Sequence, residues 1–208
     1  MLIPGATIIE HLKSASIKVD RVLHVGAHDC QEAPFYRSLD VTPENTVWID
    51  AIDSKIQRAK SLNIPNVYKG VISDTDDATV IFNVSNNEQS SSLLELGTHL
   101  VEHPDVHYVR KVTERTVTLD TFFDREGIDP AFTFWNFDIQ GAELLALKGA
   151  ERALVHAKAL YLEVNAKHLY KGCPLIGDLD AYLIPRGFKR VETQMTGHGW
   201  GDALYIRI

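Results

Sequence analysis

The sequence predicts an α/β fold, a mostly parallel sheet with helices on both of its faces. Short apolar runs rich in Val and Ile alternate along the chain with segments of helical periodicity, and this alternation implies βαβ units. Several of these runs stop at Gly or Asp, as strands do where they turn into a helix. With 208 residues, 45% of them hydrophobic, the chain can bury a full core in a single domain, residues 1–208.

The first third of the chain gives the clearest alternation. Gly26 breaks an apolar run, Pro34 is tolerated in the first turn of a helix, and Pro65 separates a helix from the next strand. We therefore expect a helix with Ile8, Ile9, Leu12 and Ile17 on one face, a strand at Arg21–Val25, a helix at Gln31–Leu39, a strand at Thr46–Ala51, a helix at Ser54–Leu62 and a strand at Asn66–Ile72.

The middle of the chain departs from this pattern. Strands are expected at Thr79–Val84 and Tyr108–Leu119, separated by the polar stretch Ser85–Asp105. A loop of that length in a compact domain is usually functional or disordered, and this one has room for a short helix around Leu93–Val101. We interpret it as a substrate or lid region.

The last third returns to alternation. It predicts a strand at Ala131–Asp138, a helix at Gly141–Val155, a strand at Ala159–Asn165, a helix at Leu175–Ile184, and strands at Gly187–Thr193 and Ala203–Ile208.

The composition limits the partners and the setting. A formal charge of -7, with scattered Lys and Arg, argues against nucleic acid or an anionic membrane as the main ligand. Cys30 and Cys173 have no metal-ligand spacing and are expected to be free thiols in a cytoplasmic protein. No run of about 18 apolar residues predicts a membrane span. The domain can also be one module of a longer polypeptide, and the oligomeric state stays open.

Two residues predict a nucleotide-type pocket. Gly26 ends the first strand at the carboxyl edge of the sheet, where ligands bind in open α/β folds. Asp50 ends the second strand, 24 positions later, near the spacing at which a carboxylate meets a ribose diol. The alternative interpretations are a tight strand-to-helix turn at Gly26 and a turn-initiating acid at Asp50.

The turn favours S-adenosylmethionine over NAD. A dinucleotide site needs further glycines to cradle a pyrophosphate, but Gly26 is followed by Ala27, His28, Asp29 and Cys30. Asp29 is expected to repel a pyrophosphate and to attract a sulfonium and an amino group.

A third strand end adds Asp138, followed by a turn at Gly141. A carboxylate there can hold the methionine amino group, bind a metal or take a proton from an acceptor hydroxyl. Glu143 needs no function, because the first turn of a helix favours an acid. With Glu163 and Asn165, Asp138 can also form an oxygen-rich divalent site, which is possible but not predicted.

Taken together, these segments resemble the FkbM-type methyltransferase family. The blocks that carry the resemblance are Val22-Leu23-His24-Val25-Gly26-Ala27-His28, Trp48-Ile49-Asp50-Ala51, Ser90-Ser91-Ser92-Leu93, Val117-Thr118-Leu119-Asp120, Asp138-Ile139-Gln140-Gly141-Ala142-Glu143-Leu144, Leu147-Lys148-Gly149-Ala150 and Glu163-Val164-Asn165.

The resemblance implies a class I methyltransferase, Rossmann-like sheet of seven strands with the last strand antiparallel. It also implies methyl transfer from S-adenosylmethionine to a hydroxyl, often on a sugar. Cys30 stands where the family commonly has glycine, and Asp50 where glutamate is frequent. The resemblance places the cofactor against Gly26, Ala27 and His28 at its methionine part, Asp50 and Ala51 at the ribose, and Ile72 and Ser73 near the adenine.

The acceptor side is predicted from polar and aromatic residues. The long loop brings neutral hydrogen-bonding groups from Asn86, Asn87, Gln89 and Ser90, which suit a sugar but also suit a solvated loop. His198 and Trp200 precede the last strand, and an aromatic ring there can stack on a sugar or cap the core. We expect a small-molecule or glycan acceptor.

Three residues are candidates for the catalytic base: Asp138, Glu163 and His168, the last with a pKa near neutrality. His24, alone on an apolar strand, is expected to be a core residue. Two other hypotheses stay open, a nicotinamide-dependent sugar oxidoreductase and a non-catalytic module that binds a nucleotide or glycan.

Overall fold

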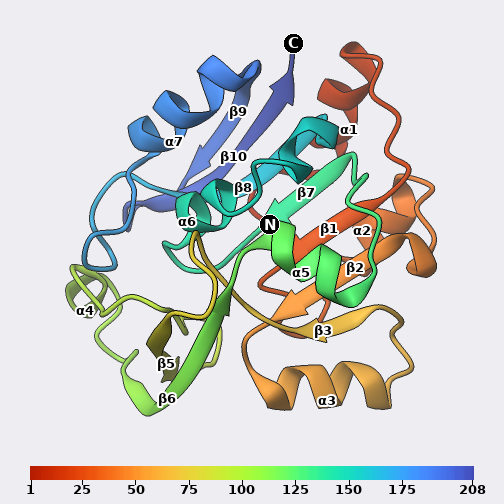
Figure 1. Ribbon diagram of the computed structural model, residues 1–208. Coiled ribbons are helices and arrows are strands. Elements are labelled where there is room, and N and C mark those ends of the chain that lie inside the picture. The colour runs from red at the N-terminus through yellow and green to blue at the C-terminus, as the bar shows by residue number, and fades with distance from the viewer.

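A computed structural model describes all residues, 1–208, as a central seven-stranded sheet flanked by helices (Figure 1). The strand order is β3-β2-β1-β7-β8-β10-β9, and β10 runs antiparallel to both of its neighbours. The strands are β1 (Val22–Val25), β2 (Thr46–Asp50), β3 (Val67–Lys69), β7 (Phe134–Phe137), β8 (Ala159–Asn165), β9 (Phe188–Met195) and β10 (Trp200–Arg207). The predicted fold class is confirmed.

Two apolar layers hold helices against the sheet. One face is covered by α5 (Leu119–Glu126), α6 (Glu143–Lys148) and α7 (Ile176–Leu183), which share a core of 26 buried residues with the strands. The other face carries α1 (Gly5–Ser14), α2 (Ala33–Ser38) and α3 (Asp53–Ser61), over a core of 18 residues. Single 3-10 turns lie at Pro43–Asn45, Ala153–His156 and Ile184–Arg186.

A second, three-stranded sheet lies beside α4 (His99–Glu102), at the lower left of Figure 1. It pairs β4 (Val71–Ile72) with β6 (Tyr108–Val117), and β6 in turn with β5 (Thr79–Ser85). The prediction of one strand at Asn66–Ile72 was therefore wrong. The strand splits at Gly70, whose amide donates to the Asp50 carbonyl at the very end of β2, so beyond this point the chain pairs with β6 instead.

Two helices differ from the sequence prediction. The helix expected to reach Val155 ends at Lys148, because the Asp120 carboxylate accepts the amides of Arg152 and Ala153 at 2.9 and 3.0 Å and turns the chain away. The helix expected around Leu93–Val101 is only the four-residue α4.

Helix α5 was missed, although its end signals are present in the sequence. Thr118 caps it by accepting the Thr121 amide at 3.2 Å, and Gly127 ends it with a φ of 65°. The remaining predicted helices and strands are confirmed, with end shifts of up to three residues, as at the starts of β7 and β10. Ile17, expected on the first helix, lies beyond the end of α1 at Ser14. None of the helices combines the length and apolar character needed to cross a membrane.

Gly149, directly after α6, packs closely against the backbone that follows β4. A methyl group there would lie 2.1 Å from the Ser73 carbonyl oxygen. We expect Gly149→Ala to lower the free energy of unfolding by about 1–3 kcal/mol through overpacking. Gly177→Ala, at an open position in the first turn of α7, is the control and should leave it unchanged or raise it by ~1 kcal/mol. Urea unfolding measures both, and equal effects would contradict the close contact.

Candidate active site

A cavity of about 590 Å³ opens at the carboxyl edge of the parallel strands. It is lined by Gly26, Asp50 and Asp138, which stand at the ends of β1, β2 and β7, and by Trp200 and Asp202 at the start of antiparallel β10. Its volume lies within the ~300–1,000 Å³ typical of small-molecule sites, and its position is the one where open α/β sheets bind ligands.

Gly26 brings two strand ends into direct contact. Its φ is 91°, and a Cβ atom there would lie 1.8 Å from the Asp138 carbonyl oxygen. The amides of Gly26 and Ala27 both donate to the Ile49 carbonyl, at 2.9 and 3.1 Å. Only glycine fits this turn, which therefore lies against the end of β7 and leaves the backbone open to the cavity.

Asp50 is fixed by backbone amides at the opposite side of the same turn. Its Oδ2 accepts from the His28 amide at 2.7 Å and its Oδ1 from the Ile52 amide at 2.8 Å. Burial raises the pKa of Asp50, and the two amides act against that rise. Each carboxylate oxygen can still accept a second hydrogen bond, so the group can receive two hydroxyls from the cavity.

The expectation that the Asp29 carboxylate repels a pyrophosphate and attracts a sulfonium was wrong. Asp29 lies 3.4 Å from both Lys55 and Arg58 and does not line the cavity. The carboxylates that do line it are Glu32, Asp50, Glu88, Asp138, Glu163 and Asp202, and the lining contains no Lys or Arg. The cavity thus has the negative character that was expected of Asp29, but from other residues.

Gln140 holds two carboxylates together at the cavity wall. Its side-chain amide donates to Asp138 at 2.6 Å and also to Glu163, while its Oε1 accepts the Tyr170 hydroxyl at 2.5 Å. Burial, then the nearby charges of Asp138 and Glu143, raise the pKa of Glu163 well above its usual range. Both effects favour the protonated form of Glu163, which can donate a hydrogen bond.

Glu143 stabilises the turn Asp138–Gly141 through hydrogen bonds to its backbone amides. Its Oε1 accepts the amides of Ile139 and Gly141 at 2.9 and 3.3 Å, and the side chain is fully buried. Burial raises the pKa of Glu143 to about 8, while those amides act against the rise and Asp138 adds to it. This contact keeps Gln140 and Gly141 in their left-handed conformations, φ 56° and 92°.

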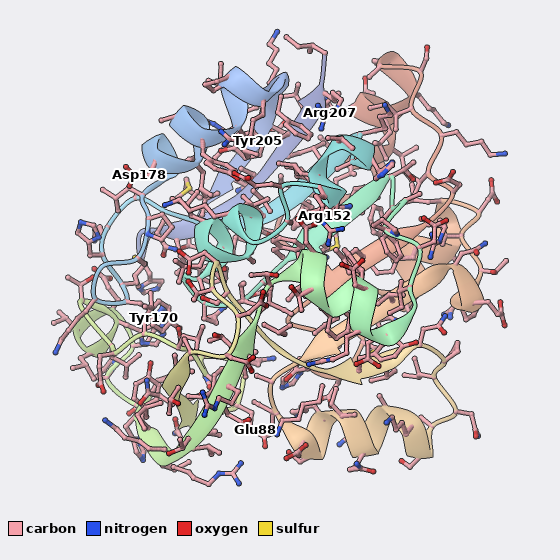
Figure 2. All side chains as sticks on the ribbon, viewed as in Figure 1. Glu88, Arg152, Tyr170, Asp178, Tyr205 and Arg207 are labelled. Carbon is pink, nitrogen blue, oxygen red and sulfur yellow. The ribbon has the colours of Figure 1, made fainter.

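The segment after β5 forms the second wall of the cavity. The side-chain oxygen of Asn87 accepts from the Ser90 amide at 3.0 Å, and the Ser92 hydroxyl donates to the Gln140 carbonyl at 2.8 Å. Lys55 of α3 reaches across to Glu88 at 2.7 Å, and Figure 2 shows Glu88 between α3 and the small sheet. The loop is therefore tied to the domain at several points.

The structure brings most of the predicted site residues to this cavity. Besides the carboxylates it is lined by His28, Ala51, Ile72, Asn87, Gln89, Ser90 and Trp200. Ser73 is buried outside the lining, and Ala27 packs in the core that faces α1–α3. His24, expected in the core, lies 2.8 Å from the Tyr36 hydroxyl and also borders the cavity.

Three other predicted residues lie away from the cavity. The Asn86 side chain closes its own loop by donating to the Asp105 carbonyl at 3.0 Å. The Nδ1 of His168 lies 3.0 Å from the Cys173 carbonyl, and His198 is an exposed residue beside Glu102 at 3.3 Å. None of the three lines the cavity.

Sequence reasoning missed His99, His103, Gln140 and Tyr170, which all line the cavity. The sequence did contain a clue to Gln140, because this residue lies inside the turn that follows the strand-end residue Asp138. The sequence contained no clue to the two histidines. Their segment reaches the cavity only through contacts with residues about 70 positions away, such as the hydrogen bond from the Gly97 amide to the Leu169 carbonyl at 2.6 Å.

Several buried polar atoms in the lining have no hydrogen-bond partner within the protein, although Nδ1 of His28 lies 3.4 Å from an Asp29 carboxylate oxygen. These atoms are both ring nitrogens of His28, both side-chain polar atoms of Asn165, and Nδ1 of His99. Buried polar groups are nearly always hydrogen-bonded, so such a cluster indicates a ligand with several polar groups of its own. No group of three or more His, Cys, Asp and Glu side chains is arranged to hold a metal ion.

Comparison with known proteins decides the family. The family model described as the methyltransferase FkbM domain matches residues 24–190, most of the chain. The chain belongs to the FkbM methyltransferase family. Its cofactor is S-adenosylmethionine. The resemblance proposed from the sequence is confirmed, while no curated protein matches this sequence.

A solved structure of the same family shares the fold. A methyltransferase FkbM from Methylobacillus flagellatus KT shares 17% identity with a TM-score of 0.55, over 91% of this chain and 44% of that chain. The magnesium protoporphyrin IX methyltransferase of Synechocystis PCC 6803, with bound cofactor, shares 10% identity with a TM-score of 0.48, over 98% and 78%. This FkbM-family chain thus spans less than half the length of the Methylobacillus protein.

The residues around the cavity fit the cofactor. The open backbone at Gly26, the two free acceptor positions of Asp50 and the Nε2 atom of His28, which has no hydrogen-bond partner, offer contacts for its polar groups. The carboxylate lining suits a ligand with a sulfonium and an amino group. Cys30 adopts a φ of 54°, a conformation that favours the glycine common there in the family.

Glu143 should make the protein less stable as the pH rises. Between pH 4.5 and about 8 this residue is protonated in the folded protein and ionised in the unfolded chain, so folding binds a proton and rising pH favours unfolding. We expect the advantage of wild type over Glu143→Gln in unfolding free energy to fall across this interval, with a slope of up to ~1.4 kcal/mol per pH unit.

Denaturant unfolding at a series of pH values measures this difference. Exposed Glu10, mutated to Gln, is the control and should give a difference that does not change over the same interval. A flat Glu143→Gln difference would mean that the residue is ionised in the folded state.

Proposed function

We propose that this protein transfers the methyl group of S-adenosylmethionine to a hydroxyl of a sugar or glycan. The observation that carries the proposal is the division of the cavity into two walls. One wall is the strand edge with Gly26, Asp50 and Asp138, and the other is the segment around Asn87–Ser90. Family membership supports the cofactor, and the polar second wall supports the acceptor class.

The cofactor half of the proposal assigns contacts to the strand edge. The Asp50 carboxylate accepts hydrogen bonds from the ribose hydroxyls, with Ala51 beside it. Gly26, Ala27 and His28 adjoin the methionine part through backbone and imidazole. Ile72, with Ser73 behind it, covers the adenine. When bound, the cofactor supplies an electrophilic methyl carbon.

At the centre of the cavity, Asp138 and Glu163 have different roles. Asp138, held by Gln140, provides the negative charge that the cofactor's amino group needs. The raised pKa of Glu163 favours its protonated form, which serves as a hydrogen-bond donor rather than as a second charge. Positioning the two reactants in this way can contribute about 7–11 kcal/mol to the reaction.

The acceptor half uses neutral groups. Asn87, Gln89 and Ser90 offer amide and hydroxyl groups that match sugar hydroxyls, and the Trp200 ring offers an apolar face. The lining has six carboxylates and no Lys or Arg, an arrangement that disfavours phosphates and carboxylates on the acceptor. We therefore propose a neutral sugar, in a free or glycan-linked form.

Two wider points belong to the proposal. Residues 1–208 form one methyltransferase domain, either alone or as a module of a longer polypeptide. The free thiols of Cys30 and Cys173 favour a reducing compartment such as the cytoplasm.

Asp50 provides the first test. Asp50→Asn replaces one acceptor oxygen with an amide nitrogen, and we expect roughly 100-fold weaker binding of S-adenosylmethionine, equal to ~3 kcal/mol of charge-assisted hydrogen bonds. Asp53→Asn, on the exposed start of α3, is the control and should bind normally. Calorimetry measures both, with thermal unfolding as a check on folding. Unchanged affinity, or preferred binding of NAD, would contradict the cofactor assignment.

The acceptor's charge provides the second test. Methyl glycosides should be methylated with a kcat/KM roughly 10-fold or more above that of their 6-phosphates, since like charges oppose one another in the cavity. The matching 6-O-acetyl glycosides separate charge from bulk and should resemble the unmodified sugars. Transfer of the labelled methyl group from S-adenosylmethionine measures the rates. A preference for the phosphates would overturn the neutral acceptor.

A further inference from the structure

Three histidine rings run from the cavity to the surface. The ring centroids of His99 and His103 are 4.8 Å apart, and those of His103 and His198 are 4.7 Å apart. Their exposure rises along the row, since His99 is buried, His103 is half-buried and His198 is 53% exposed. At the outer end, Glu102 lies 3.3 Å from His198 and pairs with Lys167 at 2.7 Å.

His99 is the inner end of this row and borders the cavity. It is 6% exposed, and its Nδ1 atom is buried with no partner in the protein. Its position is fixed, because its amide donates to the Leu169 carbonyl at 3.2 Å and its ring packs on Tyr170 with centroids 5.4 Å apart. A fixed, buried imidazole without a partner is available to a ligand.

Tyr170 connects His99 to the centre of the site. The Tyr170 hydroxyl donates to Gln140, and Gln140 donates to Asp138, at 2.5 and 2.6 Å. Figure 2 shows Tyr170 beside the small sheet, on the side of α4. His99 thus lies on the acceptor wall, one aromatic ring away from the group that holds Asp138.

The surroundings of His99 keep it neutral. Burial lowers its pKa below the ordinary value of 6.5, and the neighbouring charge of His103 lowers it further. The titratable groups that face its ring are His103 from the same segment and Tyr170 from the segment after β8, while Glu102 and His198 adjoin the outer part of the row. A neutral imidazole can accept a proton at pH 7.

We propose that His99 is the general base of the reaction and that His103 and His198 carry the proton onward to solvent. This inference rests on the proposed function. The acceptor oxygen forms its bond to the methyl carbon as the carbon–sulfur bond breaks, the sulfonium leaves as a neutral thioether, and the hydroxyl proton passes to the His99 ring. The proton is then released at exposed His198, where Glu102 stabilises the cationic ring.

The other candidates for the base fit less well. The Nδ1 of His168 lies 3.0 Å from the Cys173 carbonyl and the residue is not in the cavity lining. The raised pKa of Glu163 favours its protonated form, and the Gln140 amide already donates to its carboxyl group. Asp138 accepts from Gln140 and faces the cofactor side.

The first test needs no acceptor. NMR titration of the histidine ring signals, in the complex with S-adenosylhomocysteine, should give His99 a pKa below 6.5. His103→Asn removes the neighbouring positive charge and should raise that pKa, whereas His156→Asn, on an exposed turn far from the row, should not change it. A His99 pKa at or above 6.5, or one indifferent to His103→Asn, would overturn the proposal.

The second test uses methyl glycosides as acceptors. His99→Asn should lower kcat by about 10²- to 10⁴-fold, as expected for loss of a general base, and abolish the fall of kcat at acid pH. The affinity for S-adenosylhomocysteine should stay that of wild type, which also reports correct folding. His156→Asn should behave as wild type. An unchanged kcat, or a retained acid limb, would contradict the role of His99.

The two tests distinguish this proposal from the proposed function. If no glycoside is methylated, the acceptor class is wrong, and the titration still decides whether His99 has the properties of a base. If glycosides are methylated and His99→Asn retains full kcat, the proposed function stands and the base lies elsewhere.

Discussion

The contact between Gly26 and the Asp138 carbonyl is the constraint on which the rest of the site depends. Strands β1 and β7 are neighbours in the sheet and end at the same level, so their two exit turns meet. They fit together only because Gly26 has no Cβ atom and adopts a positive φ. The same turn positions the His28 amide for Asp50, so one glycine aligns the ends of three adjacent strands.

The second constraint is electrostatic. Collecting buried carboxylates at one edge costs free energy, and the protein limits this cost in three ways. Backbone amides bind Asp50 and Glu143, the Gln140 side chain bridges Asp138 and Glu163, and Lys55 neutralises Glu88. The remaining cost appears as raised pKa values in Asp50, Glu143 and Glu163. A cationic cofactor would relieve part of that cost.

The sequence predicted the strand edge well because its signals are local. A glycine or an aspartate directly after an apolar run marks a strand end wherever the strand lies in the sheet, as at Gly26, Asp50 and Asp138. The split at Gly70 was not predictable, since it depends on where β2 ends relative to β3. The expected role of Asp29 was wrong because its ion-pair partners, Lys55 and Arg58, belong to α3, and only folding brings them close to Asp29.

The cavity wall that contains Asn87–Ser90 and His99 shows most clearly what the sequence alone could not predict. This wall joins two segments far apart in sequence through backbone contacts: the Gly97 and His99 amides donate to Leu169, and Leu96 pairs with Tyr170. A Cβ atom on Gly97 would lie 2.4 Å from the His168 carbonyl, so the joint is closely packed. The strand edge depends on a glycine and fixed carboxylates, whereas the wall opposite depends on backbone pairing between two distant segments, reinforced by the Ser92 and Tyr170 side chains that donate to Gln140.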